Sequence, residues 1–128
     1  MMAVTSPSVA AGQLPYAAVD GQSCHCVIYT TEFSIGRRSA GMEVDGDEAN
    51  AGATRVDVDL SGESGDVGKI SRKHVVCVRD GRGSWFMTNL GKRPVYVNGT
   101  AVQQGGKNEV YARSAIVICG VRITFASR

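Results

Sequence analysis

The chain has 128 residues, 43% of them hydrophobic and 20% charged, as expected for one globular domain with a single core. No apolar run approaches the roughly 20 residues of a membrane-spanning helix, and no Lys or Arg precedes Arg37, so we expect an intracellular protein without a secretory or transit signal. The net charge of +2 is unevenly spread: residues 1–68 hold three basic and ten acidic residues, whereas residues 69–128 hold eleven basic and two acidic ones, which favours an anionic partner.

Residues 1–22 are rich in Ala, Ser, Gly and Pro without periodicity, which predicts a flexible leader before a domain over residues 23–128. From there, runs rich in Val, Ile, Thr, Tyr and Phe are separated by Gly, Asn, Asp and Pro. The predicted strands are 24–30, 32–36, 55–60, 74–79, 84–88, 94–97, 109–112, 115–119 and 121–125. No window shows ten or more residues of helical periodicity, so the predicted fold class is all-β, an antiparallel β-sandwich.

Two features punctuate the predicted strands. Asp80-Gly81 and Asn98-Gly99 are typical of tight turns between strands. Residues 39–54 contain four acidic residues, no basic residue and mostly Gly and Ala otherwise, which predicts a long acidic loop inserted in the domain. This loop could compete with ligands for the basic half of the chain, or it could be an insertion without a regulatory role.

The four cysteines offer a metal-site hypothesis that the spacing does not complete. Cys24-His25-Cys26 has the composition of half a zinc site, but no second C-x-x-C or H-x-x-x-H pair accompanies it. Residues i and i+2 of a strand share one face, so Cys24 and Cys26 fit two buried positions. Cys77 and Cys119 lie in apolar strands. We therefore favour four reduced, packed cysteines and predict no metal and no cofactor, with a zinc site as the alternative.

Polar motifs at the edges of the predicted strands suggest anion binding. The motifs are Gly36-Arg37, Ser71-Arg72-Lys73-His74 and Asn98-Gly99. A phosphothreonine carries about −1.5 to −2 charges and three acceptor oxygens. Arg37 offers a planar fork for two of those oxygens, Ser71 a hydroxyl donor, and Arg72 a second cation. No nucleophile–base pair, carboxylate dyad or metal set is placed by spacing, so we predict no enzyme.

In their order, G-R, S-x-x-H and N-G, these motifs resemble the forkhead-associated (FHA) domain family over roughly residues 24–126. The resemblance implies an FHA/SMAD-like sandwich that binds phosphothreonine peptides without catalysis. It assigns phosphate contact to Arg37, Ser71 and Arg72. It assigns structural parts to Gly36, His74, Asn98 and Gly99. The segments V-D-V-D-L-S, K-I-S-R-K and N-L-G-K-R-P-V-Y-V-N-G are similar to a nuclear, chromatin-associated member, which implies nuclear localisation.

One loop departs from the family pattern. Many members carry T-N-G-T before the final motif, and that asparagine bonds the peptide backbone. The corresponding residues here are Lys92, Arg93 and Pro94, so an amide that donates and accepts is replaced by cations that only donate. We expect Lys92 and Arg93 to contact the ligand beside the phosphate.

The predicted partner is thus a phosphothreonine-containing protein or peptide, bound by a monomeric domain with no membrane contact. Two alternatives remain open. One is a protein-interaction domain whose phosphate site has degenerated, which the lost asparagine favours. The other is a module that binds nucleic acid or another polyanion through the basic half of the chain.

Overall fold

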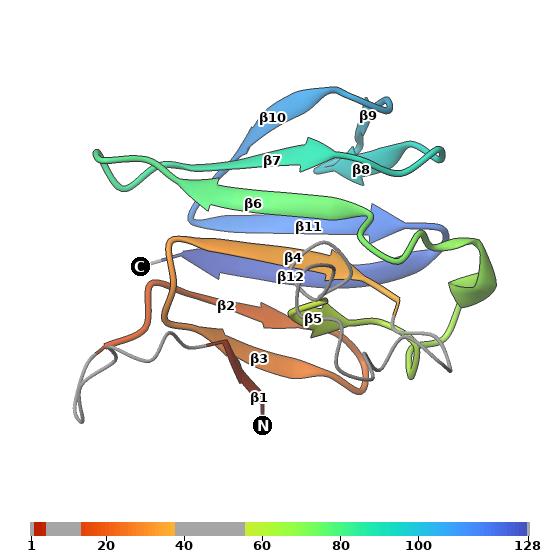
Figure 1. The fold of residues 1–128 in the computed structure, drawn as a ribbon, viewed down its shortest axis with the longest axis horizontal. Helices are drawn as coiled ribbons and strands as arrows, with labels where there is room; N and C mark the ends of the chain where they lie inside the picture. The colour runs from red at the N-terminus through yellow and green to blue at the C-terminus, as the bar shows by residue number, and fades with distance from the viewer. Residues whose placement is uncertain (1, 5–13, 38–55, 128) are drawn as a thin grey trace, which may run out of the picture.

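The computed structural model describes residues 2–4, 14–37 and 56–127, which form two β-sheets and one short 3-10 helix (Figure 1). The first sheet contains, in spatial order, β1 (Met2–Val4), β3 (His25–Ile28), β2 (Ala17–Asp20), β12 (Val121–Ser127), β11 (Arg113–Ile118), β8 (Val95–Val97) and β9 (Thr100–Val102). The second contains β10 (Lys107–Val110), β7 (Trp85–Asn89), β6 (Val75–Arg79), β4 (Glu32–Gly36) and β5 (Val58–Asp59). The helix η1 spans Val67–Lys69.

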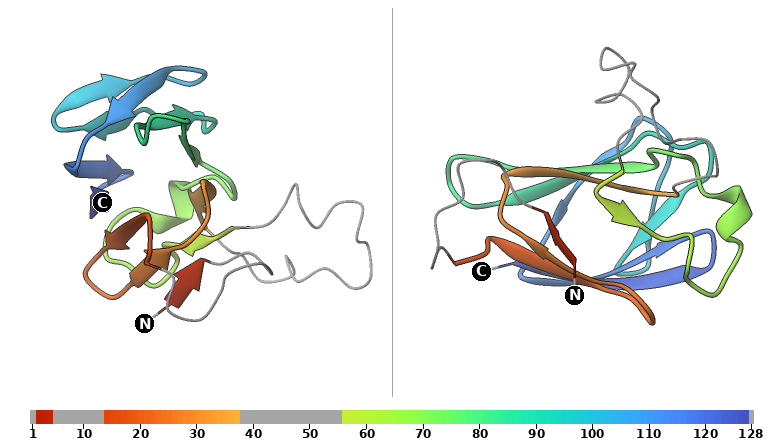
Figure 2. Two further views of the ribbon diagram at one scale, coloured as in Figure 1. Left: turned by 90° about the vertical axis from the view of Figure 1, so that its left-hand side faces the viewer. Right: turned by 60° about the horizontal axis from the view of Figure 1, so that its bottom comes forward.

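The two sheets pack face to face as separate layers (Figure 2), so the predicted all-β sandwich is confirmed. Most neighbouring strands are antiparallel, but β1 pairs with β3, and β4 with β5, in parallel. No helix among the described residues is long and apolar enough to cross a membrane.

The nine predicted strands all have counterparts, but the sandwich begins earlier than predicted. Strand β2 lies within residues 1–22, which the sequence assigned to a flexible leader. It pairs with both β12 and β3 and buries Ala17 and Val19 in the core. Alanine has weak strand propensity, so this strand depends on its two neighbours rather than on its own sequence. The acidic loop predicted at residues 39–54 lies outside the described residues.

Three aromatic side chains form the centre of the core between the sheets. The ring centroids of Phe33 and Phe125 lie 5.4 and 5.5 Å from that of Trp85, in edge-to-face contacts. Strand alternation turns Trp85 inward and leaves Phe86 on the outer face, where Lys107 Nζ lies 5.0 Å from its ring centroid. The indole is therefore a packing residue and is not available to stack on a nucleic-acid base.

The cysteines pack as small hydrophobic residues. Cys24, Cys26 and Cys77 are buried, and Cys119 is half-buried. Burial, with Cys24 as a lesser cause, raises the pKa of the Cys26 thiol to about 11. His25 turns to the surface, where its Nδ1 lies 2.9 Å from Asp20 Oδ1. The described residues contain no group of three or more His, Cys, Asp or Glu side chains placed to hold a metal.

Candidate functional site

Three segments far apart in the sequence meet at one end of the sandwich, on the right of Figure 1. They are the end of β4, the connection from β5 to β6 that contains η1, and the loop between β7 and β8. Hydrogen bonds tie all three together through residues 35, 74 and 93. This end therefore presents the predicted phosphate ligands and the two cations of the β7–β8 loop on one surface.

Gly36 lets the first two segments approach closely. A Cβ atom on this residue would lie 2.7 Å from the carbonyl carbon of Arg72 and 2.9 Å from the carbonyl oxygen of Ser71. These distances are well inside van der Waals contact, and both groups are backbone, which cannot rotate away. The glycine is thus required by packing between two segments rather than by a turn conformation.

Arg37 is anchored in this close contact by two hydrogen bonds. Its backbone N–H donates to the carbonyl oxygen of Ser71 at 3.2 Å, and its side-chain Nε donates to the carbonyl oxygen of Ile70 at 3.1 Å. The side chain is half-buried. Because Nε is occupied, the guanidinium plane is fixed. Its two terminal nitrogens, which hydrogen-bond no described residue, can bind an anion in a bidentate manner.

The predicted motif after η1 supplies further donors. Ser71 is half-buried, and its hydroxyl has no hydrogen-bond partner among the described residues. Arg72 is exposed, and Lys73 is half-buried. Neither cation forms an ion pair within the described part of the chain. The structure thus brings Arg37, Ser71 and Arg72 to neighbouring positions, and their contact with phosphate remains a prediction.

His74 connects the Ser71 loop to the Arg93 loop. The Ser71 backbone N–H donates to His74 Nδ1 at 3.1 Å, and His74 Nε2 lies 3.0 Å from the carbonyl oxygen of Arg93. A carbonyl oxygen can only accept, so Nε2 carries a proton. Nδ1 accepts the Ser71 N–H and therefore carries none, so the ring is neutral. The side chain is fully buried. His74 therefore holds the Ser71 and Arg93 loops together from inside the fold and is not exposed to solvent.

Two residues that sequence reasoning missed complete this support. Asn89, fully buried at the end of β7, donates from Nδ2 to the carbonyl oxygens of Arg93 and Val102 and accepts from the Gly91 N–H. Gly91 covers the His74 ring so closely that an added Cβ would lie 2.6 Å from Cε1. Together they fix the backbone from which the Arg93 side chain projects.

Glu63 anchors the segment leading to η1. Its carboxylate accepts hydrogen bonds from the backbone N–H groups of Gln22 and Ser23, each at 2.8 Å, and from the Ser23 hydroxyl. Burial opposes ionisation, but these hydrogen bonds outweigh it and lower the pKa of Glu63. The β2–β3 turn is thereby fastened to the connection that carries the predicted phosphate-binding motif.

Asn98 and Gly99 lie outside the cluster formed by the end of β4, the β5–β6 connection and the β7–β8 loop. Both have positive φ, at 50° and 86°, and they form the two-residue turn from β8 to β9, as predicted for an Asn-Gly pair. Asn98 Oδ1 accepts from the Ala115 N–H at 2.9 Å. Strand β8 starts at the Arg93 loop and runs away from it, so this turn stands at the far end of β8 and stabilises the first sheet.

Acidification should destabilise the fold through His74. Burial, offset in part by the hydrogen bond to Arg93, lowers the pKa of His74 below its usual value of about 6.5. The unfolded chain then binds this proton more readily, so stability is full above about pH 6.5 and falls as the pH drops below it. We expect a lower free energy of unfolding in urea at pH 5.5 than at pH 7.5, with a slope of up to about 1.4 kcal/mol per pH unit.

The exposed His25, the other histidine of the chain, serves as the control. His25→Gln should retain the pH dependence, whereas His74→Gln should reduce it. Equal unfolding free energies of the wild-type domain at both pH values would contradict the role given to His74.

The fold and site define a β-sandwich with a cationic loop cluster at one end. A family model described as the FHA domain matches residues 33–119. Because this match covers more than half of the sequence, the chain belongs to the FHA family.

Solved structures agree with this fold. An engineered FHA domain with a Myc-pTBD peptide superposes with a TM-score of 0.68 at 11% identity, covering 91% of this chain and 94% of the other. The N-terminal FHA domain of Saccharomyces cerevisiae Rad53p, in complex with a phosphothreonine peptide, gives 0.66 at 12% identity, covering 88% and 94%. The Chlamydia trachomatis CT664 FHA domain gives 0.63 at 12% identity, covering 88% and 98%.

Proposed function

We propose that this FHA domain binds phosphothreonine-containing segments of a partner protein and performs no catalysis. The observation that carries the proposal is the Arg37 guanidinium, which donates from Nε to the Ile70 carbonyl while its terminal nitrogens bond no other described residue. The Ser71 hydroxyl and the Arg72 side chain supply a neutral and a charged donor beside it. This set matches the three acceptor oxygens and the double charge of a phosphothreonine.

The relatives support the same ligand class. The Rad53p FHA structure contains a phosphothreonine peptide, and the Mek1 FHA structure contains a HOP1 phosphothreonine peptide. FHA domains in general are binding modules rather than enzymes. We infer that Lys92 and Arg93 contact the ligand beside the phosphate in place of the asparagine found in many members, and that the domain acts as a monomer.

We also propose a nuclear, chromatin-associated setting for the whole protein. Its support is the similarity of V-D-V-D-L-S, K-I-S-R-K and N-L-G-K-R-P-V-Y-V-N-G to the FHA domain of microspherule protein. Fluorescence microscopy of the tagged full-length protein tests this setting, and a uniformly cytoplasmic signal would contradict it.

The loss of the usual asparagine favours a second candidate, a domain that binds its partner without regard to phosphorylation. A phosphopeptide array probed beside matched unphosphorylated peptides separates the two. We expect binding only to phosphothreonine peptides, with no signal for the plain forms. Equal capture of both forms would favour the degenerate interaction domain, and binding governed only by salt concentration and total negative charge would favour a polyanion binder.

A further inference from the structure

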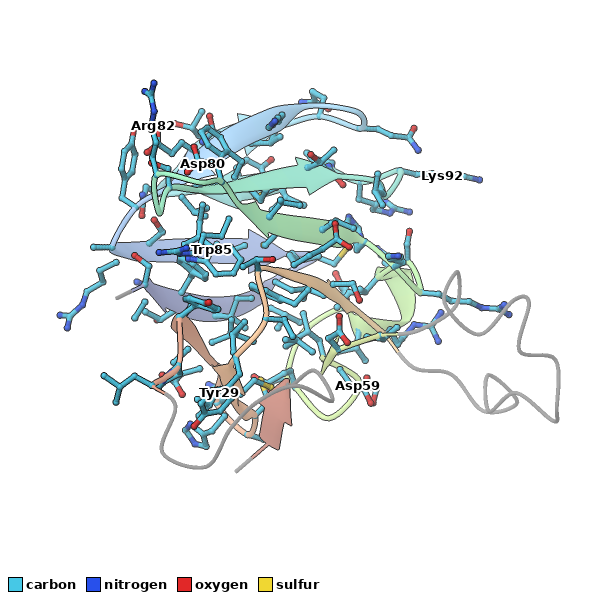
Figure 3. The ribbon with its side chains drawn as sticks, turned by 60° about the vertical axis from the view of Figure 1, so that its left-hand side comes forward. Tyr29, Asp59, Asp80, Arg82, Trp85 and Lys92 are labelled. Atoms are coloured by element: carbon cyan, nitrogen blue, oxygen red, sulfur yellow. The ribbon has the colours of Figure 1, made fainter. Side chains whose placement is uncertain are left out.

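A group of unpaired donors lies at the end of the sandwich opposite the predicted phosphate ligands. The β6–β7 turn stands at this end, on the left of Figure 1, and Figure 3 shows its residues Asp80 and Arg82 far from Lys92. Arg79 and Trp85 are register partners beside this turn and lie on the inner face of their sheet. Arg79 Nε and Trp85 Nε1 are buried and have no hydrogen-bond partner among the described residues. Native proteins leave few such atoms unpaired, so this end of the core has more donors than acceptors.

The Arg79 guanidinium is held in place without a counter-ion. Its Cζ lies 4.6 Å from the centroid of the Tyr16 ring, which immediately precedes β2 in the other sheet. A Cβ atom added to Gly83 would lie 3.1 Å from Arg79 Nη2, so the guanidinium also contacts the β6–β7 turn. The half-buried Arg79 side chain forms no ion pair and no hydrogen bond with any described residue. Because the ring and the turn already orient this cation, an anion can bind it at little entropic cost.

The neighbouring carboxylates do not neutralise this cation. Asp80 follows Arg79 directly, but its Oδ1 accepts hydrogen bonds from the backbone N–H groups of Arg82 and Ser84, each at 2.9 Å. Glu32 pairs in register with the residue before Arg79, so its side chain lies on the outer face of the second sheet. The charge of Arg79 is therefore available to an anion from another molecule.

Exposed apolar side chains border the same end of the sandwich. Tyr111 is 60% exposed and follows the last residue of β10, which pairs in register with Trp85. Leu14 is 67% exposed and precedes Tyr16 by two residues. Aromatic and arginine side chains are enriched in protein interfaces and supply most of their binding energy. Since these apolar contacts come from both sheets, a segment that neutralises Arg79 can continue past it in two directions.

We propose that this end of the domain is a second binding site, which takes a glutamate or aspartate side chain flanked by apolar residues in a segment of a partner protein. The carboxylate accepts hydrogen bonds from the Arg79 guanidinium. Its apolar neighbours pack on Leu14, Tyr16 and Tyr111. The site shares no residue with the predicted phosphate ligands, so the domain can hold this segment and a phosphopeptide at the same time.

The test follows the indole N–H signal of Trp85, the one tryptophan of the chain, in proton–nitrogen correlation spectra. The probe is a short acetylated and amidated peptide with a single glutamate between leucines. We expect this peptide to shift the Trp85 signal and the matched glutamine peptide to bind at least about tenfold more weakly. A leucine peptide with a free carboxyl terminus presents the carboxylate from a chain end, and it should bind no better than the glutamine peptide.

Three variants separate this site from general electrostatic attraction. Arg79→Lys keeps the charge but loses the planar fork, so it should lose most of the preference for glutamate over glutamine. Tyr111→Ser changes an exposed side chain outside the core and should weaken binding of the glutamate peptide severalfold. Arg37→Ala removes a positive charge at the opposite end and should keep the preference. Thermal unfolding checks that each variant is folded.

Equal binding of the glutamate and glutamine peptides would overturn the second site, as would a preference that survives in a folded Arg79→Lys protein. If Arg79→Lys does not fold, undiminished binding by Tyr111→Ser has the same consequence. A preference that disappears in Arg37→Ala would assign the glutamate peptide to the predicted phosphate ligands instead. Stronger binding of the peptide with the free carboxyl terminus would replace the proposed side chain by a chain end.

Discussion

Replacing Arg37 by alanine is expected to weaken phosphothreonine-peptide binding by about 100-fold or more and to remove the preference over the plain peptide. Hydrogen bonds to charged groups contribute about 1.5–3 kcal/mol each, and a bidentate arginine supplies two. Among the predicted ligands, Arg37 is the one whose side chain hydrogen-bonds another described residue, through Nε to the Ile70 carbonyl. Its orientation therefore costs little on binding.

The fold should tolerate this change. Alanine removes one hydrogen bond from the half-buried guanidinium to the Ile70 carbonyl, a loss of about 1.5 kcal/mol, and the residue 37 backbone N–H still donates to the Ser71 carbonyl. Thermal unfolding followed by circular dichroism checks the fold, and anisotropy with paired peptides checks binding. Arg37→Lys keeps the charge but loses the planar fork, so it should bind with intermediate affinity.

Arg82→Ala provides the charge-matched control, since Arg82 is exposed in the β6–β7 turn. This variant should bind as the wild type does. An Arg37→Ala protein that still favours the phosphorylated peptide by the wild-type factor would place the phosphate elsewhere.

How far the sequence predicts this structure depends on the range of the interactions. Period-two alternation and turn residues are local, so the nine predicted strands and the Asn98-Gly99 turn were found. Strand β9 was missed because it has only three residues, two of them exposed. Strand β2 was missed because its Ala-rich sequence becomes a strand only between β12 and β3.

The residues that support the site could not be predicted from the sequence, because their hydrogen-bond partners are far away along the chain. The Glu63 carboxylate accepts hydrogen bonds from Ser23 and Gln22, which precede it by 40 and 41 positions in the sequence. Asn89 donates to the carbonyl oxygen of Val102, which follows it by 13 positions. No spacing rule connects a single glutamate or asparagine to a backbone amide that far away. The motif residues Gly36, Ser71 and His74 were singled out because they recur together in a family pattern, and the structure now supplies the contacts that join them.

The second large effect is expected from Gly36→Ala, which should destabilise the domain by about 1–3 kcal/mol, as overpacking of a tight site does. The new Cβ would fall against the Arg72 carbonyl group and the Ser71 carbonyl oxygen. These atoms belong to the backbone of the loop that carries Ser71 and Arg72, so relief requires that whole loop to move. That movement breaks the hydrogen bond from the Arg37 N–H to the Ser71 carbonyl and separates Arg37 from Ser71.

Gly68→Ala is the matched control, because Gly68 lies in the β5–β6 connection that carries Ser71 and Arg72, has no positive φ, and would place a Cβ with no atom within 4 Å. It should leave both unfolding free energy and peptide affinity close to wild type. Gly36→Ala should lower both, since one methyl group displaces the loop that carries two of the three proposed phosphate ligands. If the two variants unfold at the same urea concentration and bind the phosphopeptide equally, the close approach at Gly36 does not set the geometry of the site.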